Sequence, residues 1–162
     1  MQKACNPKCA LELAVKEREK KEAEELKKVR RKLRQLSQKD LPKSRRAAQA
    51  AFNAYIRERD RGLPCISCQR HHEGQYHAGH YLSRGAHPEL AFEESNCHKQ
   101  CAPCNNHLSG NIARYRINLI EKIGQMGVDW LEGPHDPVKH TAEELRAIEK
   151  LYKQKKKELQ SN

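Results

Sequence analysis

The chain has 162 residues, enough for one modest domain, and 36% of them are hydrophobic while 33% are charged. With two Phe, one Trp and five Tyr it cannot form a large apolar core, so we expect a small nucleus held by metal, with helices attached. The net charge of +11 is concentrated in residues 1–46, where sixteen Lys and Arg face seven Asp and Glu, a net of +9. This uneven charge favours a polyanionic binding partner, and nucleic acid is the first candidate. The alternative is a charged surface that is simply solvated.

The sequence contains no stretch long and apolar enough to span a membrane, and no signal peptide is visible in "MQKACNPKCALELAV". The seven cysteines are odd in number, and four of them form two Cys-x-x-Cys pairs. This usage indicates metal-bound thiolates in a reducing cytoplasm, not the disulfides of a secreted protein.

The first expected element is a long charged helix over residues 10–38. Leu26, Val29, Leu33 and Leu36 recur at the spacing of a coiled-coil seam, but over only about two heptads. A seam this short does not establish a homodimer, and a single exposed helix that rests on the body or on DNA is the plainer interpretation.

A second helix is expected over residues 45–61. Pro42 should end the first helix, Ser44 should cap the second, and Gly62 should follow its end. Three arginines crowd its last turn, where they either complement the helix dipole or contact phosphates: Arg57, Arg59 and Arg61.

The middle of the chain should form a hairpin and then return to helix. "GQYHAGHYLS" is typical of a strand, and "ELAFEES" is the candidate partner strand. Apolar residues at helical spacing predict a helix over 111–126, which Gly127, Gly133 and two prolines should end. Thr141 and Glu144 form a capping box that should start a last, basic helix.

Two cysteine pairs carry the strongest chemical signal. Each places two sulfurs on a tight turn, and together they complete a four-sulfur Zn²⁺ site: Cys65, Cys68, Cys101 and Cys104. A closed four-sulfur site leaves no position for water, so this zinc should be structural. A disulfide or redox role is the alternative, and Cys97 should simply pack.

The order His80, Asn96 and Asn105 around the second cysteine pair resembles the HNH endonucleases, also called His-Me finger nucleases, in their zinc-carrying form. The resemblance implies a hairpin and a helix around a catalytic cation. It implies His80 as general base, Asn96 as the residue that pins the orienting loop, and Asn105 as a ligand of Mg²⁺ or Mn²⁺.

The chain departs from that family at one place. The family has Asp or His directly before the base, and here this residue is Gly79. Because side chains alternate along a strand, His77 points to the same side, and we expect the space above Gly79 to let it supply the missing ligand. An imidazole would favour Mn²⁺ or a loosely held Mg²⁺, and phosphate contact is the alternative role for His77.

Longer strings resemble the NinG family of lambdoid bacteriophages, also called Rap, over nearly the whole chain: "ALELAVKEREKKEAEE", "AFNAYIRERDRGLPCISC", "AGHY" and "NCHKQCAPCNNHLSGN". The resemblance implies a recombination endonuclease that cuts branched DNA such as Holliday junctions and D-loops, acting in the cytoplasm of the host bacterium beside phage or host recombination proteins. The family usually carries a further cysteine cluster at its N-terminus. Here only Cys5-x3-Cys9 stands there, so a second zinc is an open question.

The expected fold is therefore α+β and mostly helical. It has a basic helical leader (1–43), a zinc-stabilised ββα-metal core of HNH type (44–126) and a C-terminal linker with a basic helix (127–162). Arg84, just past the first strand, either holds a phosphate or is a surface charge. His71, His72 and His87 should be surface turn residues, and His98 should pack. The competing functions are a zinc-stabilised nucleic-acid-binding protein without catalysis, and a scaffold for recombination proteins.

Overall fold

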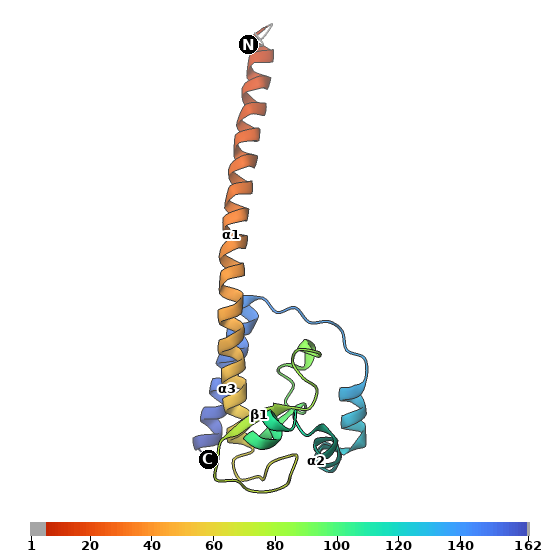
Figure 1. Ribbon diagram of the computed structural model, residues 1–162. Coiled ribbons are helices and arrows are strands. Elements are labelled where there is room, and N and C mark those ends of the chain that lie inside the picture. The colour runs from red at the N-terminus through yellow and green to blue at the C-terminus, as the bar shows by residue number, and fades with distance from the viewer. Residues whose placement is uncertain (1–5, 162) are drawn as a thin grey trace. The chain divides into compact units, whose positions relative to one another are not determined.

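The computed structural model describes residues 6–161, without the side chains of residues 37–39. The chain divides into two compact units, Met1–Pro42 and Lys43–Asn162, and the elements are drawn in Figure 1. In the first unit, the four residues of the predicted seam are each at least 52% exposed. Among the described residues, no helix is both long enough and apolar enough to cross a membrane.

Helix α1 (Pro7–Arg59) corrects the prediction of two helices. Pro42 lies inside it, and Ser44 is a buried helical residue, not a cap. A proline removes one backbone hydrogen bond and costs about 3 kcal/mol, but it does not end a helix that favourable residues continue on both sides. Here alanines follow directly, at 47, 48, 50 and 51, and they are strong helix formers.

The hairpin consists of β1 (Tyr76–His80) and β2 (Cys97–Cys101), paired antiparallel with Tyr76 opposite Cys101 and His80 opposite Cys97. The first strand confirms the prediction, but the partner strand lies further on than "ELAFEES". The first two residues of that stretch instead belong to the short 3-10 helix η1 (Pro88–Leu90). Every residue of β2 is buried, although three of the five are polar.

Helix α2 (Ile112–Glu132) runs past the predicted end at residue 126, and Gly127 does not interrupt it. The helix kinks instead at Gly124, whose φ of 79° is a conformation that only glycine adopts without strain. Helix α3 (Ala142–Ser161) begins with the predicted capping box. The Thr141 N–H donates to Glu144, and the Glu144 N–H donates to the Thr141 hydroxyl.

Two apolar clusters hold the second unit together. In one, Phe52 and Tyr55 of α1 pack against Tyr152 of α3, with ring centroids 4.8 and 5.3 Å apart. Figure 1 shows α3 alongside this end of α1. In the other, Tyr115 and Leu119 of α2 pack against the loops around the hairpin. The hairpin therefore lies between two separate apolar layers.

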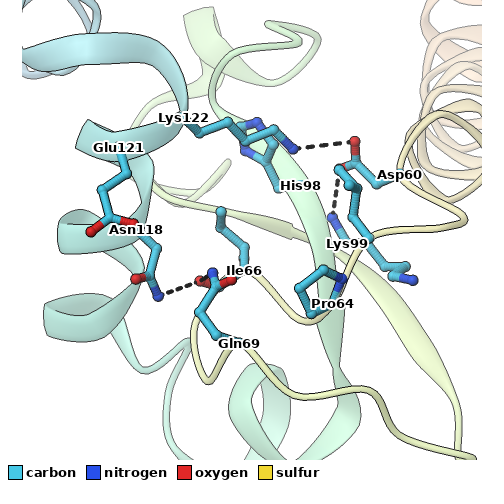
Figure 2. Close-up of a pocket in the computed structure, with 10 residues that line it drawn as sticks. Asp60, Pro64, Ile66, Gln69, His98, Lys99, Asn118, Glu121 and Lys122 are labelled. Atoms are coloured by element: carbon cyan, nitrogen blue, oxygen red, sulfur yellow. Dashed lines mark hydrogen bonds and ion pairs between the residues drawn. The ribbon is translucent and has the colours of Figure 1, made fainter.

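A buried carboxylate ties the end of α1 to the hairpin and to α2. Asp60 accepts the backbone N–H of Lys99 at 3.0 Å and an ion pair from Lys122 at 3.3 Å, as Figure 2 shows. Arg59 adds a third partner. Although burial raises the pKa of Asp60, these partners outweigh it and hold the pKa below its usual value. In the cavity of about 290 Å³ beside Asp60, this carboxylate and the Lys122 ammonium are therefore already paired with each other.

Replacing Phe52 with Ala should destabilise the protein by about 3 to 5 kcal/mol, because the ring is fully buried between α3 and the hairpin. Urea unfolding of the metal-loaded protein, followed by circular dichroism, measures this free energy. The control is Leu33→Ala, at a side chain 60% exposed, which should change stability by less than about 0.5 kcal/mol. Equal costs for the two variants would contradict the packing described here.

Candidate metal centre and active site

The four predicted zinc ligands come together in the structure. The sulfurs of Cys65, Cys68, Cys101 and Cys104 all lie within 4.8 Å of one another. Cys65 and Cys68 come from a loop, Cys101 ends β2, and Cys104 lies in the short π-helical turn η2 (Pro103–His107). Four sulfurs this close fit a tetrahedral metal such as Zn²⁺. The site could hold such an ion and would then tie the loop, the strand and the turn together.

Hydrogen-bond donors surround the sulfur cluster. The Cys101 N–H donates to the Cys65 sulfur at 3.4 Å, and the Asn111 amide donates to the Cys104 sulfur at 3.6 Å. Burial raises the pKa of the Cys65 thiol, but the surrounding N–H groups outweigh it and bring the pKa below its usual value. A thiolate is the form that binds metal, so the donors favour that form at Cys65, whereas burial raises the pKa of the Cys68 and Cys101 thiols.

His72 was predicted to be a surface turn residue, and the structure corrects this. Its Nε2 lies 3.2 Å from the Cys68 sulfur, and its backbone N–H donates to the Tyr76 hydroxyl at 2.7 Å. An imidazole N–H directed at a metal-bound sulfur is a common supporting contact. The spacing of four residues from Cys68 was the only sequence signal for it.

His80 ends β1 in a half-buried setting. Its Nε2 lies 3.1 Å from the carbonyl oxygen of Ala91, and its ring lies 5.9 Å from that of Phe52. Because a carbonyl only accepts, Nε2 carries the hydrogen and Nδ1 keeps a lone pair. Nδ1 lies 3.6 Å from the sulfur of Cys97, a long contact to a weak donor.

Burial lowers the pKa of His80 to about 4, and the nearby positive charge of Arg84 lowers it in the same direction. The ring is therefore neutral at physiological pH and able to accept a proton. Cys97 does not join the sulfur cluster. It packs beneath His80, as predicted, and burial raises the pKa of its thiol.

Asn96 is fully buried and joins the two ends of the loop between the strands. Its side-chain oxygen accepts the Leu82 N–H at 2.8 Å. Its amide nitrogen donates to the carbonyls of Leu82 and Leu90 at 3.0 and 3.2 Å. Leu90 precedes Ala91, whose carbonyl contacts His80, so Asn96 fixes the loop that orients the imidazole.

A cavity of about 490 Å³ has His80, Arg84 and Asn105 among its lining residues. They come from three different segments: the end of β1, the loop after it, and η2. The Asn105 amide nitrogen donates to Asn106 at 2.8 Å, which leaves its side-chain oxygen to accept or to bind a cation. Within the described part of the chain, neither an acidic side chain nor a cysteine lines this cavity.

The turn between η2 and α2 borders the same cavity in an unusual conformation. Ser109, Gly110 and Asn111 all have positive φ, at 49°, 87° and 46°. Two of the three are not glycine, and such residues in this region are strained and cluster at functional sites. Ser109 and Gly110 line the cavity, and Asn111 contacts the sulfur cluster.

His77 and Gly79 lie on the other face of β1 and do not line this cavity. The space predicted beside Gly79 does not exist, because a Cβ added there would collide with the Gln100 side chain. Gln100 is fully buried and donates to Ser67 and to the Gly110 carbonyl. His77 Nε2 and Gln100 Oε1 are buried without a hydrogen-bond partner among the described residues, and the two residues are directly paired across the strands.

The three arginines at the end of α1 also lie outside the cavity. Arg59 is used internally: it pairs with Asp60 at 2.9 Å and donates to the carbonyls of Glu94 and Cys97 at 3.0 and 2.8 Å. Arg57 and Arg61 are exposed, and Arg61 contacts Glu58 at 3.4 Å. His98, predicted to pack, is buried against the Tyr115 hydroxyl.

These features define a small α+β protein in which a cysteine cluster and a histidine-containing cavity flank one hairpin. A family model described as Bacteriophage Lambda NinG protein matches residues 1–162, and the chain belongs to this family. It is 46% identical over 172 residues to Protein ninG of Escherichia phage lambda, covering 98% of this chain and 84% of that protein. The same values hold for Protein ninG of Salmonella phage P22.

Protein ninG of Escherichia phage 933W is 49% identical over 131 residues. That match covers 81% of this chain and 65% of the phage 933W protein. No solved structure matches the chain.

The sulfur cluster should bind one zinc ion per chain. Replacing Cys101 with Ser should remove this ion, whereas Cys97→Ser, which also removes a buried thiol of β2, should retain it. Elemental analysis of the purified variants measures the ratio of zinc to chain. A second ion in the unaltered protein would point to the Cys5-x3-Cys9 segment, of which Cys5 lies outside the described residues. Zinc retained in full by Cys101→Ser would refute the assignment.

Proposed function

We propose that this chain is a metal-dependent DNA endonuclease of HNH type, with His80 as general base and Asn96 as the residue that positions it. The observation that carries the proposal is the shared cavity, in which a neutral imidazole, a guanidinium and an amide oxygen line one space. A phosphodiester needs these three chemical functions for hydrolysis: a proton acceptor, a positive charge and a cation ligand.

The proposed reaction begins with a water molecule placed between His80 and the phosphorus. His80 takes a proton from this water through the nitrogen that does not contact Ala91. The water oxygen then bonds to phosphorus, and the bond from phosphorus to the 3′ oxygen breaks. Arg84 holds the non-bridging phosphate oxygens during this step.

A divalent cation, Mg²⁺ or Mn²⁺, would stabilise negative charge on the phosphate and on the departing oxygen. Asn105 fits such an ion because its neutral oxygen faces the cavity and its amide nitrogen is already used by Asn106. His77 fits less well, since it lies on the other face of β1. We therefore assign Asn105 as the protein ligand of the cation. That His77 is a further ligand is a separate hypothesis, which a variant can test.

The substrate class follows from the resemblance to the NinG family, also called Rap, and to zinc-carrying HNH nucleases. It is branched DNA, including Holliday junctions and D-loops, met in the host cytoplasm together with recombination proteins. The basic leader would supply affinity that does not depend on sequence. Its exposed seam of Leu26, Val29, Leu33 and Leu36 offers a surface for a homodimer, which would cut two strands symmetrically.

The alternative function is a zinc-stabilised nucleic-acid-binding protein without catalysis. Its specific support lies beside Gly79, at the position where HNH nucleases usually have a second cation ligand. In this chain the Gln100 side chain fills that space. It shares the metal cluster and the basic surface with the proposed nuclease. Only an assay of DNA cleavage can therefore distinguish the two functions.

Replacing His80 with Ala should abolish cleavage of a labelled four-way junction in Mg²⁺ or Mn²⁺ while DNA affinity stays within about twofold, because the base is removed and the phosphate contacts remain. Gel analysis of products and a binding titration on the same junction measure the two properties. His71→Ala, at an exposed histidine outside the cavity, is the matched control and should cut normally. Cutting by His80→Ala at the rate of the unaltered protein would refute the assignment, and binding without cutting by the unaltered protein would favour the alternative.

Replacing Asn105 with Ala should weaken Mn²⁺ binding in the presence of uncleaved junction by about tenfold, because one ligand is lost. His77→Ala reports on the second candidate. If it leaves both cation affinity and cleavage intact, His77 is not a ligand. Electron paramagnetic resonance of Mn²⁺ reads binding independently of cleavage, and unchanged Mn²⁺ affinity in Asn105→Ala would remove Asn105 from the site.

A further inference from the structure

Next to the cavity that contains His80, the first cavity, lies a second cavity of about 290 Å³. It is distinct from the cavity beside Asp60. Arg45 of α1, Arg84 and Gly85 of the loop after β1, and His140 of the segment before α3 are among the residues that line the second cavity. Arg84 and Gly85 also line the first cavity, so the two share one wall. The two cavities therefore lie next to each other, with Arg84 bordering both.

The charges in this second cavity are positive and uncompensated. Arg45 and Arg84 are exposed, and within residues 6–161 neither makes an ion pair or a side-chain hydrogen bond. This separates them from Arg59 and Arg116, which are paired with Asp60 and Glu132. Among the residues that the structure describes, no acidic side chain lines the cavity. An anion would thus meet two guanidinium groups that need no internal bond to be broken.

The floor of the cavity is built from packed side chains. Phe92 packs against the apolar cluster of α1 and α3. The rings of His140 and Phe92 pack edge-to-face, with their centroids 5.5 Å apart. Gln49 is buried and donates to Asn53 at 2.9 Å. Asn53 lines the first cavity, so this hydrogen bond connects the walls of both. The two exposed arginines therefore stand beside a surface of packed side chains.

We infer that the second cavity binds a backbone phosphate of the same DNA strand, next to the phosphate that lies at His80. Arg45 and Arg84 supply the charge, and His140 stands beside them as a third donor. Nucleic acid fits because its phosphates repeat along one strand and because Arg binds phosphate oxygens in pairs. The inference rests on the proposed function for the strand's position at His80, but the binding itself is testable without cleavage.

The test uses the full chain carrying His80→Ala, so that the DNA stays uncut, and a labelled four-way junction. Adding Arg45→Ala should weaken binding by about fivefold to tenfold at 0.1 M salt. It should also reduce the slope of log K against log salt by about 0.9, the value for one lost phosphate contact. Arg45→Lys should keep the slope. Lys150→Ala, which removes an exposed and unpaired charge from α3, is the matched control for net charge and should change the slope by less.

A second measurement locates the contact on the DNA. Single phosphates of the junction are replaced, one at a time, by neutral methylphosphonates, and each is tested against the parent and Arg45→Ala. One position should weaken binding of the parent but not of Arg45→Ala, because that variant has already lost the contact. This position should lie within a few nucleotides of the bond that the unaltered protein cuts.

The outcomes are distinct. An unchanged salt slope in Arg45→Ala, or equal losses at every methylphosphonate position in both proteins, overturns the inference even where the unaltered protein cuts DNA. A protein that binds as described but never cuts supports the inference and overturns the nuclease proposal. Failure of the His80→Ala parent to bind the junction at all overturns both.

Discussion

The antiparallel pairing of β1 with β2 is the constraint on which the candidate site depends. The register places Tyr76 opposite Cys101 at one end and His80 opposite Cys97 at the other. Four residues of strand separate these ends by roughly 13 Å. The sulfur cluster can therefore stabilise the hairpin from one end while the imidazole at the other end stays free for chemistry. A slip of one residue would turn His80 to the opposite face and remove it from the cavity.

The sequence predicted the structure correctly where a set of side chains allows only one or two arrangements. Four cysteines in two pairs predicted a cluster that the structure brings within 4.8 Å, and the pattern of Thr141 with Glu144 predicted a cap that forms as expected. It failed where tertiary contacts outweighed local patterns. Strand β2 was missed because His98, Lys99 and Gln100 appear solvent-exposed by composition. In the fold they are buried, and their side chains contact Tyr115, the Arg61 carbonyl and Ser67, although Gln100 Oε1 keeps no partner among the described residues.

"ELAFEES" misled for the opposite reason. Its apolar residues alternate as in a strand, yet Leu90 packs with the α2 cluster and Phe92 with the α1–α3 cluster. A 3-10 turn sends the two side chains to separate layers, which a sequence pattern of period two cannot distinguish from a strand. The resemblance to HNH nucleases implied one site for His80 and Asn105, with Arg84 as a possible phosphate contact, and all three line one cavity in the structure. Residue patterns alone could not have placed them together, because they approach one another only through the fold.

The positively charged side chain of Arg84 lines both cavities of the candidate site. Burial is the largest cause of the low pKa of His80, and the nearby charge of Arg84 lowers that pKa further, so the imidazole is neutral. Arg84 also forms the wall between the two cavities. A phosphate placed against this guanidinium would offset its effect on His80 and make the ring a stronger proton acceptor once DNA is in place. Under the proposed function, the same contact would both position the DNA and raise the proton affinity of the imidazole.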